Sequence, residues 1–187
     1  MKKLISNKKL LLIAAIILIV VIVIAIMLSK TIFKNNMDNP DINDVANALK
    51  NIDGISDICI VTEDNDPNGN LGKQGGYTGA LYFVYDKAPE MTETLDEESD
   101  SETVEYRQYK DTCEKGTDAG GSIEIYNTVA DAEARDTYLG TFDGTSALSS
   151  GSHTISGTVL IRTSSELKAS EQKALENKII EELNKNL

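Results

Sequence analysis

The chain has few residues of the kinds from which catalytic and metal sites are built. Among its 187 residues there are one histidine and two cysteines. His153 follows Ser152 directly, and neighbours on a strand point to opposite faces of a sheet, so the two cannot act together as base and nucleophile. One histidine and two distant cysteines also fall short of a zinc site. The sequence therefore predicts neither an enzyme nor a His/Cys metal centre.

Basic residues are scarce after position 30. All 30 acidic residues lie beyond that position, together with only 13 of the 18 lysines and arginines, so this part has a net charge of −17. Such a charge argues against nucleic acid and against an anionic membrane surface as binding partners. It is typical of a soluble module held beside a membrane.

Charged residues are absent between positions 10 and 28. As a helix this apolar run would cover about 28 Å, close to the hydrocarbon thickness of a bilayer. Lysines flank it unequally, which predicts a cytoplasmic N-terminus; Lys2, Lys3, Lys8 and Lys9 precede the run, and Lys30 and Lys34 follow it. The alternative is a cleaved signal peptide, but the run exceeds a typical h-region and no A-x-A-like site follows it.

The chain is therefore predicted to be a single-pass protein of the cell membrane with an extracellular C-terminal domain. Its partner in this reading is the lipid bilayer, through residues 10–28. The predicted segments are a cytoplasmic N-terminus (1–9), a transmembrane helix (10–28), a linker (29–40) and an extracytoplasmic domain (41–187).

Hydrophobic periodicity predicts an α+β domain with about four mostly antiparallel strands and covering helices. The strand-helix-strand unit near the end allows two parallel strands joined by a right-handed crossover, in a ferredoxin-like manner. An acidic, flexible insertion is expected at about 88–119, because Glu90 to Glu105 hold eight acids and almost no large apolar side chain. The predicted elements are helices at 41–52, 128–142 and around Leu175 to Leu187, and strands at 55–62, 79–86, 120–126 and 153–163.

In the predicted helix at 128–142, Thr128 with Asp131 reads as a capping box. Ala130, Ala134, Tyr138 and Phe142 lie close to one stripe of this helix. In the final helix the corresponding stripe is Leu175, Ile179, Leu183 and Leu187.

The two cysteines, Cys59 and Cys113, form an even pair in a compartment that is not reducing. A disulfide between them would close a loop that stabilises the fold by roughly 4 kcal/mol in the chain-entropy model. The alternative is one buried thiol on a strand and one loose thiol in a loop. Both readings remain open on the sequence.

The stretch EDNDPNGN places oxygen-bearing side chains at alternate positions, with Gly69 where an EF-hand loop makes its sharp turn. The candidate calcium ligands are Asp64, Asp66, Asn68 and Asn70. The twelfth position, which should be a bidentate glutamate, is Gly75. The alternative is a β-turn at 66–69 that needs no ion. Arg135 and Arg162 are rare bases, and one of them is expected to pair with Asp64 or Asp66; otherwise they are surface charges.

The chain resembles a widespread group of membrane-anchored or lipoprotein extracytoplasmic domains of Gram-positive bacteria. The resemblance is carried by Asp66-Pro67-Asn68, Leu71-Gly72-Lys73, Tyr77-Thr78, Gly120 to Glu124, Asp131-Ala132 with Arg135 and Tyr138, and the stretch 157–162. It implies an exported, tethered α+β domain and no particular activity. Lipoprotein members keep a cysteine after the signal, which this chain lacks.

These observations predict a non-enzymatic binding or interaction module of the cell envelope, whose partner is an envelope protein or peptide. No cofactor is expected. A calcium-responsive domain, with the ion held at 64–70, is the alternative.

Overall fold

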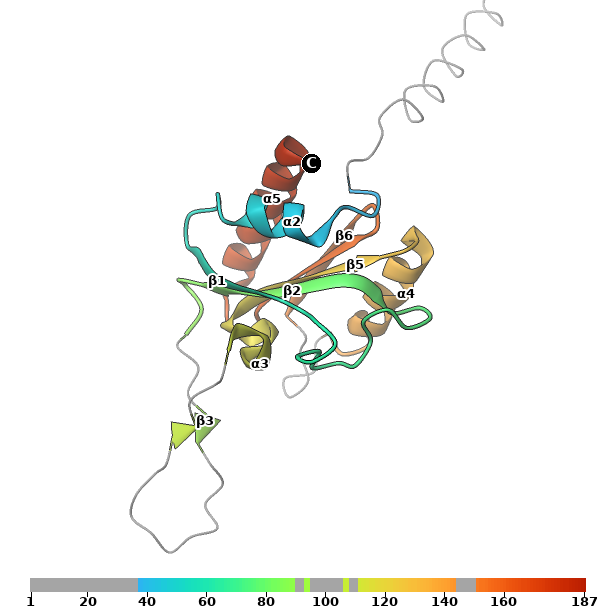
Figure 1. The fold of residues 1–187 in the computed structure, drawn as a ribbon. Helices are drawn as coiled ribbons and strands as arrows, with labels where there is room; N and C mark the ends of the chain where they lie inside the picture. The colour runs from blue at the N-terminus through green and yellow to red at the C-terminus, as the bar shows by residue number, and fades with distance from the viewer. Residues whose placement is uncertain (1–36, 90–92, 95–105, 108–110, 144–150) are drawn as a thin grey trace, which may run out of the picture. The chain divides into compact units, whose positions relative to one another are not determined.

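A computed structural model describes residues 37–89, 93–94, 106–107, 111–143 and 151–187 (Figure 1). The predicted α+β class is confirmed, but the main sheet has five strands, in the order β1-β2-β5-β7-β6, and is antiparallel throughout. Residues 36–187 make up one unit. The described elements are α2 (Ile42–Leu49), β1 (Ile55–Ile60), β2 (Tyr77–Tyr85), β3 (Glu93–Thr94), β4 (Tyr106–Arg107), α3 (Thr112–Lys115), the 3-10 helix η1 (Thr117–Ala119), β5 (Gly120–Tyr126), α4 (Val129–Gly140), β6 (Ser152–Ser156), β7 (Val159–Thr163) and α5 (Ala169–Asn186).

The predicted transmembrane run at 10–28 lies outside the described residues. Of the helices in the part of the chain that the structure describes, none has both the length and the apolarity to cross a membrane. The anchor and the topology derived from it therefore stay predictions.

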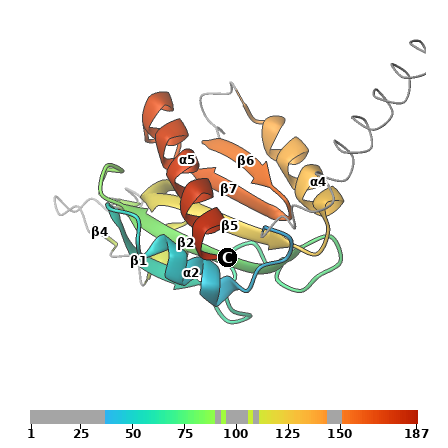
Figure 2. The same cartoon turned by 90° about the horizontal axis from the view of Figure 1, so that it is seen from above.

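One face of the sheet is covered by α2 and α5, which lie over the strands in Figure 2. The stripe predicted for the last helix faces this core, with Leu175, Ile179 and Leu183 fully buried. The strands contribute Leu81, Phe83, Ile123, Ile125 and Ile161 to the same cluster. We call this side the apolar face. The apolar face forms because every second residue of each strand and one stripe of each helix are apolar, and these side chains all lie in the layer between sheet and helices.

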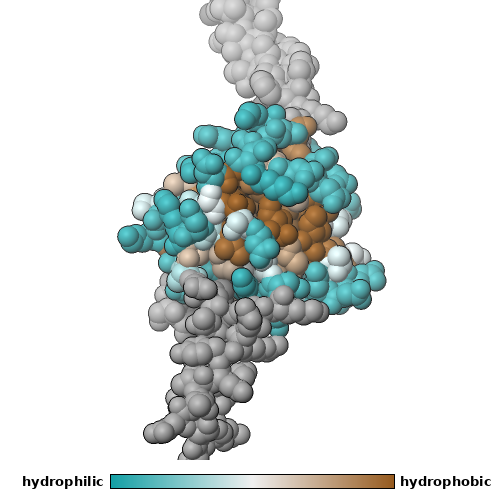
Figure 3. Space-filling view, turned by 60° about the vertical axis from the view of Figure 1, so that its left-hand side comes forward, coloured by the Kyte–Doolittle hydropathy of each residue, from teal (hydrophilic) through white to brown (hydrophobic). Residues whose placement is uncertain are grey.

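The apolar layer reaches the surface at the β1 edge of the sheet. Ile55, Ile58 and Ile60 of this edge strand are only half-buried, although they pack against the core. Figure 3 shows apolar side chains exposed between hydrophilic ones on this side of the domain. An edge strand has a neighbour on one side only, so its side chains are less completely covered.

The opposite face carries α3 and α4 and a second, smaller cluster. Val61, Ala80, Tyr82, Tyr126 and Leu160 are buried there, with Cys113 of α3 and with Ala132 and Leu139 of α4. We call this side the polar face, because charged and hydroxyl-bearing strand residues lie among the apolar ones. Of its two helices, α3 has only four residues, and loops cover part of this side of the sheet (Figure 1).

Helix α4 begins as predicted but buries a different stripe. Thr128 is its N-cap, and its side chain accepts a hydrogen bond from the backbone N–H of Asp131. The stripe with Ala130, Ala134 and Tyr138 faces solvent, and Tyr138 is 54% exposed. Ala132 and Leu139 face the sheet instead. The helix can expose its predicted stripe because few side chains are needed to cover the polar face.

The segment 153–163 is a hairpin, and the prediction of one long strand is wrong. Gly157 has a φ of 61°, and β6 and β7 pair with each other on either side of it. A Cβ atom at Gly157 would lie 2.6 Å from the Met37 carbonyl oxygen, so only glycine fits this turn. The turn reverses the chain, so β7 runs antiparallel to β5. The strands β5 and β6, which α4 joins, therefore run parallel to each other with β7 between them, as in a split βαβ unit. The predicted parallel direction of the strand-helix-strand unit is confirmed, although no two neighbouring strands of the main sheet are parallel.

Most of the predicted acidic insertion at 88–119 lies outside the described residues. Within it, β3 and β4 pair as a two-stranded antiparallel ladder. The last part, 111–119, forms α3 and η1 against the polar face. The Asp111 side chain caps α3 by accepting a hydrogen bond from the backbone N–H of Glu114.

Candidate functional site

The strand register brings four polar residues into one row across the polar face. Tyr82 of β2 lies opposite Ser122 of β5, which lies opposite Arg162 of β7, which lies opposite His153 of β6. Residues directly opposite each other in an antiparallel pair point to the same face. The row therefore collects side chains from four strands on one surface, under α3 and α4.

Glu124 lies next to this row and binds two arginines. Its side chain is 1% exposed. Arg135 of α4 donates from Nε to Oε2 at 3.1 Å and from Nη2 to Oε1 at 3.4 Å. Arg162 donates from Nη1 to Oε1 at 3.3 Å. The Tyr126 hydroxyl donates to Oε2 at 2.6 Å. We call these four residues the Glu124 cluster.

The electrostatics of the Glu124 cluster favour its observed charges. Burial alone lowers the pKa of Arg135, but the carboxylate of Glu124 outweighs it and leaves this pKa above its ordinary value. Burial, followed by the negative charge of Glu124, raises the pKa of Tyr126 and keeps its hydroxyl protonated as a donor. Two guanidinium groups on one carboxylate leave the cluster with one excess positive charge.

The sequence contained a signal for this cluster that the predictions missed. Ser122, Glu124 and Tyr126 alternate with Ile123 and Ile125, which marks one polar face along β5. One of the two arginines was expected to pair with Asp64 or Asp66, with a surface charge as the alternative, but the structure places both on Glu124. Sequence separations of 11 and 38 residues from Glu124 do not identify these partners without the fold.

An open pocket of about 390 Å³ lies between α4 and the loop that joins β1 to β2. We call it the α4 pocket. Arg135 connects it to the Glu124 cluster, because this side chain lines the pocket and also binds Glu124. The Arg135 guanidinium lies 5.4 Å from the centroid of the Tyr138 ring. The pocket is lined by Asn70, Gln74, Gly75, Gly76, Tyr126, Asp131, Ala134, Arg135 and Tyr138.

The predicted calcium loop is organised around Asp66 by hydrogen bonds. The Asp66 carboxylate accepts from the backbone N–H of Asn68 at 3.0 Å and of Leu71 at 2.8 Å, and from the Tyr77 hydroxyl. The Gly69 N–H donates to the Asp66 carbonyl oxygen, which closes the β-turn at 66–69. Burial raises the pKa of Asp66. The hydrogen bonds from Tyr77 and from the backbone lower it by more, so the pKa lies below its ordinary value.

The other proposed calcium ligands make different contacts from those of Asp66. The Asn68 amide donates to the Tyr82 hydroxyl at 2.9 Å, while Asp64 and Asn70 are exposed. Both Asp66 carboxylate oxygens already accept hydrogen bonds from the protein. The geometry of this loop is that of a hydrogen-bonded turn.

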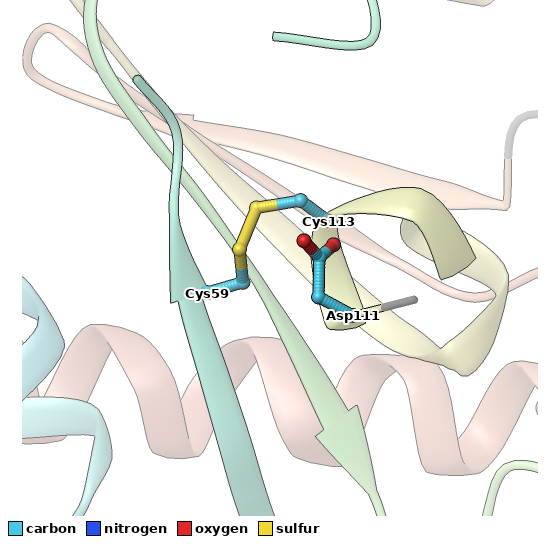
Figure 4. A group of neighbouring side chains, drawn as sticks. All are labelled: Cys59, Asp111 and Cys113. Atoms are coloured by element: carbon cyan, nitrogen blue, oxygen red, sulfur yellow. A yellow bond between two sulfur atoms is a disulfide. The ribbon is translucent and has the colours of Figure 1, made fainter. Parts of the chain in front are cut away.

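Cys59 of β1 and Cys113 of α3 form a disulfide, with Cα atoms 5.5 Å apart. Figure 4 shows Asp111 beside the two sulfurs. Among the described residues these three are the one group of acids, cysteines and histidine close enough to hold an ion together. Metals bind the thiolate, which a disulfide does not offer. The bond therefore serves to fix α3 on the polar face.

His153 connects β6 to α4 and the turn after it. Its Nδ1 lies 2.6 Å from Asp136 Oδ1, and its Nε2 lies 3.4 Å from Asp143 Oδ2 without making a hydrogen bond. The imidazole is therefore hydrogen-bonded to Asp136 and lies close to Asp143. This arrangement positions α4, and with it Arg135 and Tyr138, on the sheet.

Comparisons with family models, with curated proteins and with solved structures found no match to this chain. The functional reading of the polar face therefore depends on its geometry and chemistry.

Proposed function

We propose that this chain is a single-pass, membrane-anchored extracytoplasmic binding module that recognises another envelope component, a protein or peptide, through the α4 pocket. The lysine-flanked apolar run at 10–28 and the acidic composition after residue 30 support the anchored topology. The absence of a nucleophile and base pair in the sequence supports a non-enzymatic role.

The observation that carries the binding role is the exposed aromatic surface beside the pocket. Tyr138, which lines the pocket, is 54% exposed. The Tyr138 ring packs edge-on against Phe142 with centroids 5.1 Å apart, and Arg135 lies over the same ring. A tyrosine held in this way offers rigid contact area and a polar tip at little entropic cost on binding.

The pocket also has the composition of a peptide site. Asn70 and Gln74 offer amide donors and acceptors, Gly75 and Gly76 bring backbone close to the cavity, and two tyrosines form apolar walls. Peptide backbones need hydrogen-bond partners of both kinds along with apolar contacts. A volume of about 390 Å³ is at the lower end of the range for ligand pockets, which is suitable for a short segment.

Site-specific photo-crosslinking in intact cells tests this function. A photoreactive phenylalanine at position 138 of the full chain is expected to give one defined adduct with an envelope protein. Two controls are exposed positions elsewhere in the domain, Lys178 on α5 and Ser56 on the β1 edge. The proposal fails if position 138 gives no adduct, or if Ser56 alone gives one, which would move the interface to the β1 edge.

The topology has its own test. Protease added outside intact cells should release a fragment that contains residues 41–187, while a tag placed before residue 10 remains protected. A tag that is degraded from outside, or a domain that resists protease until the cells are opened, would contradict the proposed orientation.

A further inference from the structure

We propose that the α4 pocket binds a zwitterionic short peptide, with Arg135 as the donor to its free carboxylate and Asp131 as the acceptor from its free ammonium group. This inference rests on the proposed function, because it names the chemical class of ligand that the same pocket takes. The inference is based on two charged side chains that line the pocket, the negative Asp131 and the positive Arg135, which do not pair with each other.

Asp131 and Arg135 lie one turn apart on α4, and both line the α4 pocket. Opposite charges at this spacing normally attract each other on a helix surface. Among the described residues, however, each is held by a different neighbour. Asp131 Oδ2 accepts from the Thr128 hydroxyl at 2.6 Å, and Arg135 binds Glu124. The two charges are thereby kept apart and available to a ligand that carries both.

Arg135 is prepared to bind a carboxylate. A guanidinium has five N–H donors in a fixed plane. Nε and one N–H of Nη2 bind Glu124, and no described residue accepts a hydrogen bond from the remaining three. The bidentate contact with Glu124 fixes the plane, so the free edge is oriented before a ligand arrives.

The second arginine prevents Glu124 from cancelling the charge of Arg135. Arg162 binds Oε1 of the same carboxylate, and its side chain is 12% exposed. The cluster therefore keeps one excess positive charge, and Arg135 is the member that lines the pocket. This charge is locally distinct from the acidic remainder of the domain, which by itself would repel an anion.

The rest of the lining fits the middle of a short peptide. Tyr126 and Tyr138 supply aromatic walls, and the side-chain amides of Asn70 and Gln74 match a peptide N–H and carbonyl. A pocket of about 390 Å³ accommodates one or two small residues between the charged groups. A ligand with only one of the two charges leaves Asp131 or Arg135 without its partner.

Three dipeptide probes test the charge requirement on the full chain in detergent micelles. Alanylalanine carries both charges, N-acetylalanylalanine carries only the carboxylate, and alanylalanine amide carries only the ammonium group. Saturation-transfer NMR titrations are expected to give a Kd for alanylalanine about tenfold or more below that of either analogue. Equal affinity for the amide would overturn the role of Arg135, and equal affinity for the acetylated peptide would overturn that of Asp131.

Substitutions then locate the site. Arg135→Gln is expected to weaken alanylalanine binding about tenfold or more, and Asp131→Asn is expected to remove the preference for alanylalanine over the acetylated peptide. Arg162→Gln is expected to weaken binding less than Arg135→Gln, because it removes the charge compensation at Glu124 but no donor from the pocket lining. Binding lost equally in Arg135→Gln and Arg162→Gln would overturn direct contact by Arg135. Arg135→Lys keeps the charge and reports on the pocket if Arg135→Gln fails to fold.

The dipeptide titrations and the crosslinking experiment can fail independently of each other. An adduct at position 138 with no dipeptide binding would overturn this inference and leave the proposed function standing. Charge-dependent dipeptide binding with no adduct would support the ligand class and contradict an envelope protein as its source.

Discussion

The two faces of the sheet share the same five strands but differ in what covers them. The apolar face is packed by α2 and by the 18 residues of α5, and its strand side chains form an apolar core. The polar face is covered by α3, of four residues, by α4 and by loops, and it holds Glu124, Arg162 and His153. A long amphipathic helix can cover strands completely, whereas short elements leave places where charged groups reach solvent at one end. The comparison places the larger apolar core on one face and the paired charged groups on the other.

A large loss is expected on the apolar face, and a loss of similar size is expected at the Glu124 cluster of the polar face. Phe83→Ala should reduce the free energy of unfolding by about 3–5 kcal/mol, because the ring is fully buried and its removal leaves a cavity. Urea denaturation of residues 37–187, followed by far-UV circular dichroism, measures it. The matched control is Tyr138→Ala, an aromatic truncation on the exposed side of α4, which should cost under about 1 kcal/mol. Equal losses would contradict the assignment of the two faces.

Glu124→Leu should cost about 3–5 kcal/mol, since it leaves two arginines without their carboxylate in a largely buried place. The triple variant Glu124→Leu, Arg135→Met, Arg162→Met should recover most of this free energy, because apolar side chains can replace a buried ion cluster. The free energies of unfolding of the single and the triple variant are measured by the same urea denaturation. A triple variant as unstable as the single one would mean that the cluster is required for folding, and the comparison of the faces would need revision.

The disulfide joins the polar face to β1. Replacing both Cys59 and Cys113 with alanine should lower the free energy of unfolding by about 2–4 kcal/mol, because the bond joins residues that are 54 positions apart in the sequence. Differential scanning calorimetry at neutral pH measures the change. Thr112→Val is the control, since it removes only the 2.7 Å hydrogen bond from Thr112 to Asp57 that ties the same two elements. Equal effects of the two variants would show that the covalent bond adds nothing to this tie.

Asp66→Asn should cost about 1–2 kcal/mol at neutral pH, because a charged acceptor of three hydrogen bonds is replaced by a weaker one. The pKa of Asp66 is lowered from its ordinary value of 3.8. Its contribution is therefore fully present above that value and is lost as pH falls through the lower folded pKa. Urea denaturation of both proteins between about pH 2 and pH 7 should show the difference shrinking at the acidic end. A constant difference would contradict the lowered pKa.

Calcium is expected to have the smallest effect. Both Asp66 oxygens are already used in hydrogen bonds, so millimolar calcium should leave the thermal midpoint of residues 37–187 equal to that in chelator. A bound ion at about 100 times its dissociation constant would add roughly 2.7 kcal/mol and raise the midpoint by several degrees. A rise in the wild type that is absent in Asp66→Asn would show that the loop holds calcium.

Local pattern predicted the parts of the fold that depend on local physics. The stripe of Leu175, Ile179 and Leu183 and the alternation of Ile123 and Ile125 identified the apolar face, because burial follows the period of each element. The hairpin at Gly157 was missed because apolar residues continue on both sides of it. The stripe of Ala130, Ala134 and Tyr138 on α4 was predicted to be buried because it is apolar, but it faces solvent.

The candidate site was predictable only in its components. The sequence singled out Arg135, Arg162 and Asp66, but it predicted Asp64 or Asp66 as the partner of one arginine, whereas both arginines bind Glu124. An ion pair forms where the register and a helix bring opposite charges together, and Glu124 is brought to both arginines by the pairing of β5 with β7 and by the docking of α4. No local pattern contains that information.

The sequence alone determined the α+β class, the positions of most helices and strands and the N-cap of α4 at Thr128, because these follow from periodicity and from hydrogen bonds between near neighbours. The tertiary structure decided the strand order, the reversal at Gly157, the joining of Cys59 to Cys113 and the convergence of Arg135 and Arg162 on Glu124. These features join residues distant in the chain, whose proximity is set by the packing of the whole domain.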